Sequence, residues 1–192
     1  MDDRLYRFLK VTAITMTLLW VGWAGYDSFF KNKVPGEHAY HAANKLFEDG
    51  DYERALQAYD EALQNQSDDI HALRGRARSL MQLGRSKDAL TDFNLAIKRQ
   101  PEFAGTYASR GILYDRMGEY EKAIADYERA LQLDPDVAKG PHWLTRFLRL
   151  QPEKPPTVAD RARYLRAELA KPASQRMLRQ PELDSAQRSY KQ

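Results

Sequence analysis

Two histidines are the first residues of this sequence whose spacing could support chemistry. His38 and His41 stand three residues apart beside Glu37, so one helix would place both imidazoles on the same side, where they could bind a metal ion. Two histidines near the edge of a folded unit are more often plain surface residues. We therefore predict no metal site.

Catalytic patterns are absent from the sequence. It contains no cysteine, which excludes disulfides, thiolate metal sites and a cysteine nucleophile. It contains no glycine-rich phosphate loop and no serine nucleophile elbow. The paired acids Asp68 and Asp69 belong to a predicted loop, where solvation explains them. We therefore predict a protein that is not an enzyme, with no catalytic residues and no cofactor.

Charge is distributed unevenly along the chain of 192 residues, whose net charge is +3. Residues 36–137 hold 13 Lys/Arg and 19 Asp/Glu, whereas residues 138–192 hold 12 and five. An acidic body with a basic tail suggests a tail that meets something anionic, and a solvated tail explains the charge equally well. The three arginines around Tyr164 could touch nucleic acid, but the acidic body and the apolar N-terminus disfavour that partner.

The N-terminal segment is strongly apolar. Residues 11–26 form an uncharged run of 16 residues, which as a helix spans about 24 Å. A bilayer core needs roughly 20 residues, so apolar residues on both sides must extend the run. Aromatic residues gather at its far end, as they do at membrane interfaces. We predict a transmembrane anchor over 11–30, between a flank at 1–10 and a linker at 31–35. A cleaved signal peptide is the alternative.

Basic residues on the two sides of this segment set its expected orientation. Arg4, Arg7 and Lys10 precede it together with the amino terminus, and Lys31 and Lys33 follow it. This count slightly favours an N-terminus in the cytoplasm. The rest of the chain would then face the far side, so we expect a single-pass protein of the bacterial inner membrane that faces the periplasm.

A tandem repeat fills the middle of the chain. Residues 36–69, 70–103 and 104–137 are three blocks of equal length that align without gaps. Small residues at positions eight, 20 and 27 would let two helices approach closely, a ring at position 24 would fill the space between repeats, and glycine at position 15 permits a tight turn. Position eight holds Ala43, Ala77 and Gly111, position 20 holds Ala55, Ala89 and Ala123, and position 27 holds Ala62, Ala96 and Ala130. The ring at position 24 is Tyr59, Phe93 or Tyr127, and the glycine at position 15 is Gly50, Gly84 or Gly118.

These blocks resemble tetratricopeptide repeats, in which antiparallel helices A and B pair and stack into a right-handed superhelix. The resemblance covers residues 36–137. Ala39 at position four and Ser67 at position 32 depart from the family pattern and suggest a looser first repeat. The resemblance implies an all-α solenoid of three helix-turn-helix repeats. Behind it we expect a mostly extended C-terminal tail, and before it the transmembrane helix.

Two further helices are expected after the repeats. Residues 138–150 carry apolar residues at the positions where helix A packs, so we expect a capping helix over the last repeat. The basic tail, residues 151–192, opens with prolines. Val158, Leu165 and Leu169 then recur at helical spacing behind Thr157, which predicts an amphipathic helix near 158–170.

Members of the resembled family bind partners on the concave side of the superhelix, through positions two, five, nine, 12 and 13 of each helix A. We call this surface the A-helix face. The resemblance implies these partner-binding residues: Tyr40, Asn44, Phe47, His71, Arg74, Arg78, Met81, Ile112, Arg116, His142 and Arg146.

Several family members bind chaperone C-termini with a carboxylate clamp, and of its polar positions this chain matches only Asn44. Tyr40, Gly75, Gly105 and Ser109 occupy the others, so a chaperone partner is not indicated. The arginines of the A-helix face still suit an acidic protein or peptide, because guanidinium pairs bidentately with carboxylate. Solvation, or pairing with acids of neighbouring helices, is the alternative.

The predicted function is that of a membrane-anchored scaffold or adaptor that binds partner proteins, such as an accessory subunit of a membrane complex. The alternative is an assembly chaperone for envelope or membrane proteins. The sequence predicts no oligomeric state.

Overall fold

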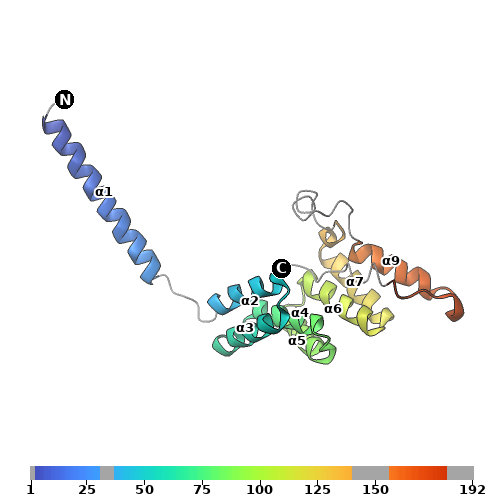
Figure 1. Ribbon diagram of the computed structural model, residues 1–192. Coiled ribbons are helices and arrows are strands. Elements are labelled where there is room, and N and C mark those ends of the chain that lie inside the picture. Colours follow the sequence, from blue (N-terminus) through green and yellow to red (C-terminus); the bar gives the residue numbers. More distant parts are fainter. Residues whose placement is uncertain (1–2, 31–36, 140–155, 181–192) are drawn as a thin grey trace.

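The computed structural model describes residues 3–30, 37–139 and 156–180, which form helices and connecting turns without any strand. Helix α1 (Asp3–Phe30) stands apart from the helical body in Figure 1. Its segment Arg4–Tyr26 has a mean hydropathy of 1.3 and no buried share. It is the one helix among the described residues that is long and apolar enough to cross a membrane, a property that signal sequences share.

Three helical hairpins form the body (Figure 1). They are α2 (Glu37–Asp49) with α3 (Tyr52–Asn65), α4 (Ile70–Gln82) with α5 (Ser86–Arg99), and α6 (Ala104–Met117) with α7 (Tyr120–Leu133). Gly50, Gly84 and Gly118 lie in the three turns with φ of +85°, +73° and +80°, which glycine adopts without strain. The expected all-α solenoid of three helix-turn-helix repeats is confirmed.

The core follows the repeat positions. The rings of Tyr59, Phe93 and Tyr127 are at most 1% exposed, and the alanines at positions 20 and 27 are fully buried. Helix α4 contacts α2, α3, α5 and α6, so the A helices α2, α4 and α6 lie side by side. This arrangement gathers the residues predicted for the A-helix face on adjacent helices.

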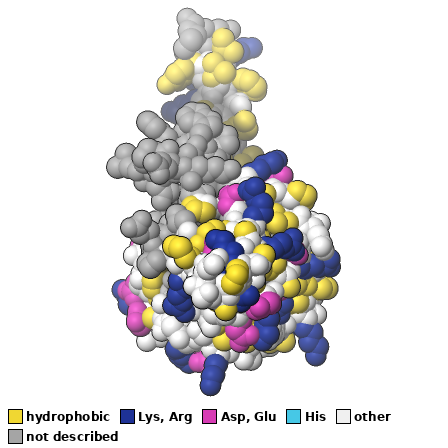
Figure 2. Space-filling model, turned by 90° about the vertical axis from the view of Figure 1, so that its right-hand side faces the viewer, with side chains coloured by type: hydrophobic (Ala, Val, Ile, Leu, Met, Phe, Trp, Pro, Cys, Tyr) yellow, Lys and Arg dark blue, Asp and Glu magenta, His cyan; other side chains and the backbone are white. Residues whose placement is uncertain are grey.

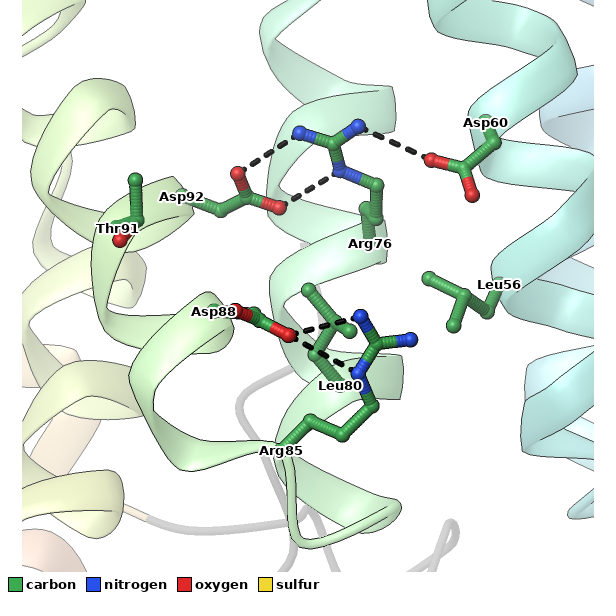
Figure 3. A pocket seen from close by; sticks show the side chains of 8 residues that line it. All are labelled: Leu56, Asp60, Arg76, Leu80, Arg85, Asp88, Thr91 and Asp92. Carbon is green, nitrogen blue, oxygen red and sulfur yellow. Dashed lines mark hydrogen bonds and ion pairs between the residues drawn. The ribbon is translucent and has the colours of Figure 1, made fainter.

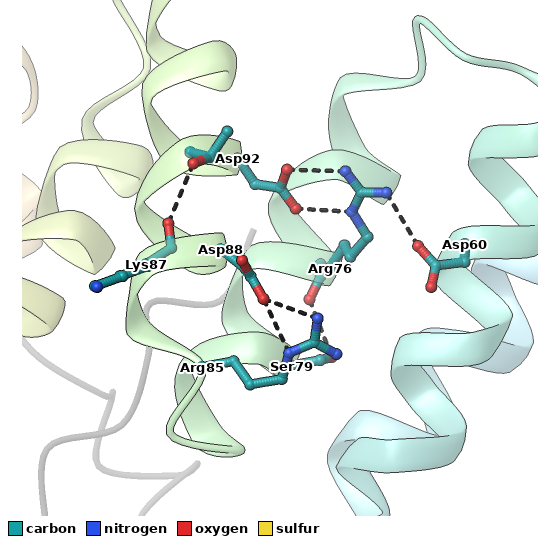
Figure 4. Close-up of polar contacts among 9 residues, drawn as sticks. Asp60, Arg76, Ser79, Arg85, Lys87, Asp88 and Asp92 are labelled. Carbon is teal, nitrogen blue, oxygen red and sulfur yellow. Dashed lines mark hydrogen bonds and ion pairs between the residues drawn. The ribbon is translucent and has the colours of Figure 1, made fainter.

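Arginines at position seven tie neighbouring repeats together on another side of the solenoid. The guanidinium of Arg76 (α4) binds both carboxylate oxygens of Asp92 (α5) at 2.7 and 2.8 Å and reaches Asp60 (α3) at 3.0 Å (Figure 4). Arg110 has the same arrangement in the next repeat, with Asp126 and Asn94. The two arginines therefore link three successive B helices.

The chain continues past the repeats with helix η1 (Pro135–Ala138), helix α9 (Val158–Leu169) and helix η2 (Ala173–Gln175). Thr157 and Asp160 cap α9 reciprocally, and α9 packs on α7 and η1. The helix expected near 158–170 is therefore present. The capping helix expected at 138–150 falls almost entirely on residues 140–155, which lie outside the described residues.

Candidate partner-binding face

The residues predicted for the A-helix face come from three adjacent helices. Helix α2 supplies Tyr40, Asn44 and Phe47, α4 supplies His71, Arg74, Arg78 and Met81, and α6 supplies Ile112 and Arg116. The remaining two, His142 and Arg146, lie outside the described residues. The described residues divide into an aromatic and cationic part on the first two repeats and a covered part on the third.

Aromatic rings line the part formed by α2 and α4. The half-buried Tyr40 ring meets the His71 ring edge-on at 6.1 Å and lies 6.3 Å from the Tyr59 ring. The Tyr59 hydroxyl donates to Asn44 Oδ1 at 2.6 Å. Burial raises the pKa of Tyr59 to about 12, so it stays a neutral hydrogen-bonding group at physiological pH.

Arg74 is the most unusual side chain of this face. It is 1% exposed, its guanidinium carbon lies 3.9 Å from the centroid of the Phe103 ring, and its Nη2 donates to Gln100 Oε1. Its Nε and Nη1 have no hydrogen-bond partner within the part of the chain that the structure describes. Burial lowers the pKa of Arg74, which means that its charge is poorly solvated.

Arg78 lies one helical turn after Arg74 on α4 and is also buried, with 6% exposure. Its guanidinium carbon lies 4.9 Å from the centroid of the Phe47 ring, and its positive charge lies near the Tyr59 hydroxyl. Two cations therefore lie on one helix face, each against an aromatic ring, and both are buried in this arrangement.

Two glycines of this face are covered by rings, which the sequence did not reveal. A Cβ atom on Gly75 would meet the Tyr59 ring at 2.2 Å, and one on Gly105 would meet the Phe103 ring at 2.7 Å. Both glycines occupy positions that carry polar side chains in the carboxylate clamp. Here Tyr59, which binds Asn44, and Phe103, which supports Arg74, fill those positions instead. The chemistry of the face therefore differs from that of a clamp.

The apolar residues predicted for this face are not open to a partner. Met81 is 3% exposed and Ile112 is 2% exposed, and both belong to the main hydrophobic core. That core also includes Val158 and Leu165 of α9. Both were predicted as partner-binding residues, and in this structure they are packed in the core because helix packing extends farther over these positions than the repeat pattern alone predicts.

Arg116 is half-buried rather than fully presented. Its Nη1 donates to Gln82 Oε1 at 3.2 Å, and its carbonyl oxygen accepts from Arg179 Nη2 at 3.4 Å. The neighbouring Asp115 is bound by Arg161 of α9. The third repeat's share of the A-helix face is thus in contact with the chain's own C-terminal segment.

A hollow of about 290 Å³ lies on the surface between α3, α4 and α5, away from these residues (Figure 3). Figure 3 shows that its walls carry Arg76 with Asp60 and Asp92, and Arg85 with Asp88. These charges already pair with one another across the helices. The residues that line the hollow therefore form a structural ion-pair network. Within the described ranges no group of three His, Asp or Glu side chains could hold a metal ion.

Models of the tetratricopeptide repeat match residues 40–105 and 104–137. The chain belongs to the tetratricopeptide-repeat family, as the sequence pattern predicted. The first TPR of Spaghetti (RPAP3) bound to HSP90 peptide SRMEEVD is a similar solved structure, with a TM-score of 0.57 and 22% identity over 71% of this chain and 94% of that chain.

The TPR2B domain of yeast Sti1 in its pHsp70 complex superposes with a TM-score of 0.51 at 25% identity, over 60% of this chain and 91% of that one. Among curated proteins, Hsp70-Hsp90 organizing protein 3 of Arabidopsis thaliana is 32% identical over 92 residues, 48% of this chain. Stress-induced-phosphoprotein 1 of Caenorhabditis elegans is 30% identical over 138 residues, 72% of this chain. The matched regions are only 16% and 41% of those two proteins.

Proposed function

We propose that this chain is a protein-binding adaptor that is tethered to a membrane by α1 and binds an acidic segment of a partner protein. The segment binds the A-helix face of the first two repeats. The observation that carries this proposal is Arg74, whose Nε and Nη1 have no hydrogen-bond partner among the described residues. It lies next to Arg78 on the same helix face, and both arginine side chains are buried in this structure. Leaving such donors unpaired is costly. A partner's carboxylate reaches them only when Arg74 turns out of its buried position, and the proposed binding includes this side-chain movement.

The similar solved domains support a peptide ligand with carboxylates. The Spaghetti domain binds the HSP90 peptide SRMEEVD, which carries two glutamates and an aspartate. In the present chain the cations stand at positions five and nine of the second repeat, whereas the clamp positions hold Gly75 and Gly105. The proposed partner is therefore acidic, without being restricted to chaperone C-termini.

Helix α1 supports the membrane tether. Its large apolar side chains, Trp20 and Trp23 among them, are at least half exposed, and a bilayer would remove them from water. The proposed location is the bacterial inner membrane with the repeats in the periplasm. There the adaptor would act as an accessory subunit of a membrane complex.

The proposal is tested by affinity purification of the intact chain after gentle solubilisation of its membrane, comparing wild type with Arg78→Glu. Losing a charge-assisted contact costs about 1.5–3 kcal/mol, and the reversed charge adds repulsion, so the partner should be retained at least tenfold less well. Retention should also fall with added salt. Arg129→Glu on α7, an exposed arginine of a B helix, is the matched control.

Equal partner recovery with both variants would show that this face is not the recognition surface. A dynamic set of substoichiometric partners, in place of one stable complex, would favour the assembly chaperone that is the alternative function.

A further inference from the structure

The C-terminal segment 157–180 lies on the third repeat's share of the A-helix face. Arg161 of α9 donates from Nε and Nη2 to the two carboxylate oxygens of Asp115 at 2.7 and 2.8 Å, and both side chains are 4% exposed. Asp115 occupies position 12 of α6, a partner-binding position in this family, and also accepts from the Tyr127 hydroxyl at 3.3 Å. A buried site for a guanidinium is thus occupied by the chain's own arginine.

The residues after α9 are held in the same place. Arg161 Nη2 also donates to the carbonyl of Leu178 at 3.0 Å, and the amide of Met177 donates to Glu168 at 2.8 Å. Arg179 reaches the carbonyl of Arg116, position 13 of α6. The chain therefore returns along α9 and covers two successive positions of the A-helix face.

The apolar contact of this segment involves few side chains. Val158, Ala162 and Leu165 are buried in the core, and Tyr164, Leu169 and Leu178 pack against it, whereas each repeat buries a large ring and several alanines. A buried ion pair roughly breaks even against its desolvation cost. Helix α9 packs on the repeats through α7 and η1 and is held further by the ion pairs of Arg161 with Asp115 and of Arg166 with Glu128. A segment attached on one side in this way can open while the rest of the structure stays folded.

We propose that residues 157–180 form a lid that opens without unfolding of the repeats and competes with the partner for the third repeat. Opening uncovers Asp115 beside Arg116, which extends the face that begins at Arg74 and Arg78. A partner that fits the extended face has acidic residues that bind these arginines. It also has a basic residue that binds Asp115 in place of Arg161. The choice of partner rests on the proposed function, but the opening does not.

The alternative is a permanent cap. Glu128 of α7 binds Arg166 of α9, just as Asp60 and Asn94, at the same position of the two earlier repeats, bind Arg76 and Arg110. Helix α9 therefore also takes the place of a following repeat, and a cap that completes the solenoid would unfold only together with it.

Hydrogen exchange of the full chain in detergent separates a lid from a cap. For a lid, the amides of α9 exchange through an opening that leaves α6 and α7 protected. Arg161→Gln should speed α9 exchange at least tenfold and leave α4 and α5 unchanged. Because that variant buries Asp115 unpaired, Arg161→Gln combined with Asp115→Asn is measured as well. Arg163→Gln, an exposed position on the same helix, is the control. Equal protection of α9 and α7 in wild type would overturn the lid.

A synthetic peptide of residues 157–180, added to the full chain, tests the site without any partner. The Arg161→Gln chain, whose own lid is weakened, should bind the wild-type peptide at least tenfold more tightly than the wild-type chain does. A peptide carrying Arg161→Gln should not bind. Absence of binding to every chain would overturn the proposal. If partner recovery is unchanged by Arg78→Glu, the proposed function is wrong, but the binding of the 157–180 peptide still supports the lid.

Discussion

The rings of Tyr59 and Phe103 pack against Gly75 and Gly105, which have no side chain and so leave room for the rings. Tyr59 thereby reaches Asn44 and Arg78, and Phe103 lies against the guanidinium of Arg74. The choice of glycine at these two positions therefore decides which cations the A-helix face presents. A planar guanidinium can lie flat on a ring and still carry donors in a fixed arrangement, so lysine would not replace these arginines.

Gly75→Ala should destabilise the protein although alanine is the better helix former. The new methyl group would lie 2.2 Å from the Tyr59 ring, and overpacking of this kind costs typically about 1–3 kcal/mol, which exceeds the roughly 1 kcal/mol gained in helix propensity. Chemical denaturation measures the change. Tyr59→Leu, which removes the ring, should make the same alanine substitution much less costly. A stabilised Gly75→Ala protein would contradict the packing described.

Arg74→Met should leave the free energy of unfolding unchanged or raise it, because it removes a buried charge whose Nε and Nη1 lack partners among the described residues. Replacing an imperfectly paired buried charge by an apolar side chain of similar size is often neutral or stabilising. Partner recovery should nevertheless fall. The measurements are a urea denaturation curve and the affinity purification. A loss of several kcal/mol would show that Arg74 serves the fold.

At the scale of helices, the repeat places an acceptor at the same point of each B helix. Asp60, Asn94 and Glu128 each bind an arginine of the helix that follows in the stack. The first two pairs join complete repeats, and the third joins α7 to α9. Helix α9 therefore takes the position of a repeat helix, and ion pairs with Asp115 and Glu128 add to its apolar contact with the core.

Acid should release α9 before the repeats unfold. Hydrogen bonds from Thr157 lower the pKa of Asp160, and Lys171 together with the Met177 amide lowers the pKa of Glu168. A carboxyl whose pKa is lowered by folding contributes stability above its unfolded pKa of about 4, and that contribution is lost as pH falls through the folded value. NMR signals of α9 should therefore change below about pH 4 while those of α4 and α5 persist.

Asp160→Asn combined with Glu168→Gln serves as the control for this acid transition. The double variant lacks both titrating groups, so its α9 signals should no longer change separately from the others. If α9 and α4 lose their signals together in the wild-type protein, the two carboxylates do not control the attachment.

At the scale of the whole molecule, a single apolar helix precedes the solenoid. Arg4–Tyr26 carries aromatic side chains toward its C-terminal end, and Arg7 and Lys10 near its start can extend their charges to the headgroups. Figure 2, which views the molecule from the α7 and α9 end, shows basic side chains spread among acidic and apolar ones. That mixed surface suits a body that stays in water, as the proposed membrane tether requires.

N-terminal sequencing of the protein isolated from membranes tests whether α1 is retained. A retained anchor predicts a sequence that begins within the first residues of the chain, because bulky aromatic residues around Gly22 and Ala24 make a poor cleavage site. A new N-terminus near Gly25 would identify a signal peptide, and the adaptor would then be released from the membrane.

The repeats could be predicted from the sequence because their helices and turns depend on short-range signals. Small residues at close helix contacts, rings between repeats and glycines with positive φ all recur once in each repeat, and each acts through neighbours a few residues away or in the next repeat. The turns at Gly50, Gly84 and Gly118, and the helix that begins after Thr157, follow from such local signals. The helices that carry the A-helix face could be predicted in the same way.

Only the tertiary structure decided how much of that face is open. Asp115 and Arg161 are 46 residues apart, a separation that does not match the repeat length. No spacing in the sequence therefore predicts that they form an ion pair. The burial of Met81 and Ile112 likewise depends on how helices from different repeats and α9 pack together. Sequence periodicity specifies which side of a helix turns inward. Which of those side chains a distant segment then covers depends on long-range packing, which periodicity does not encode.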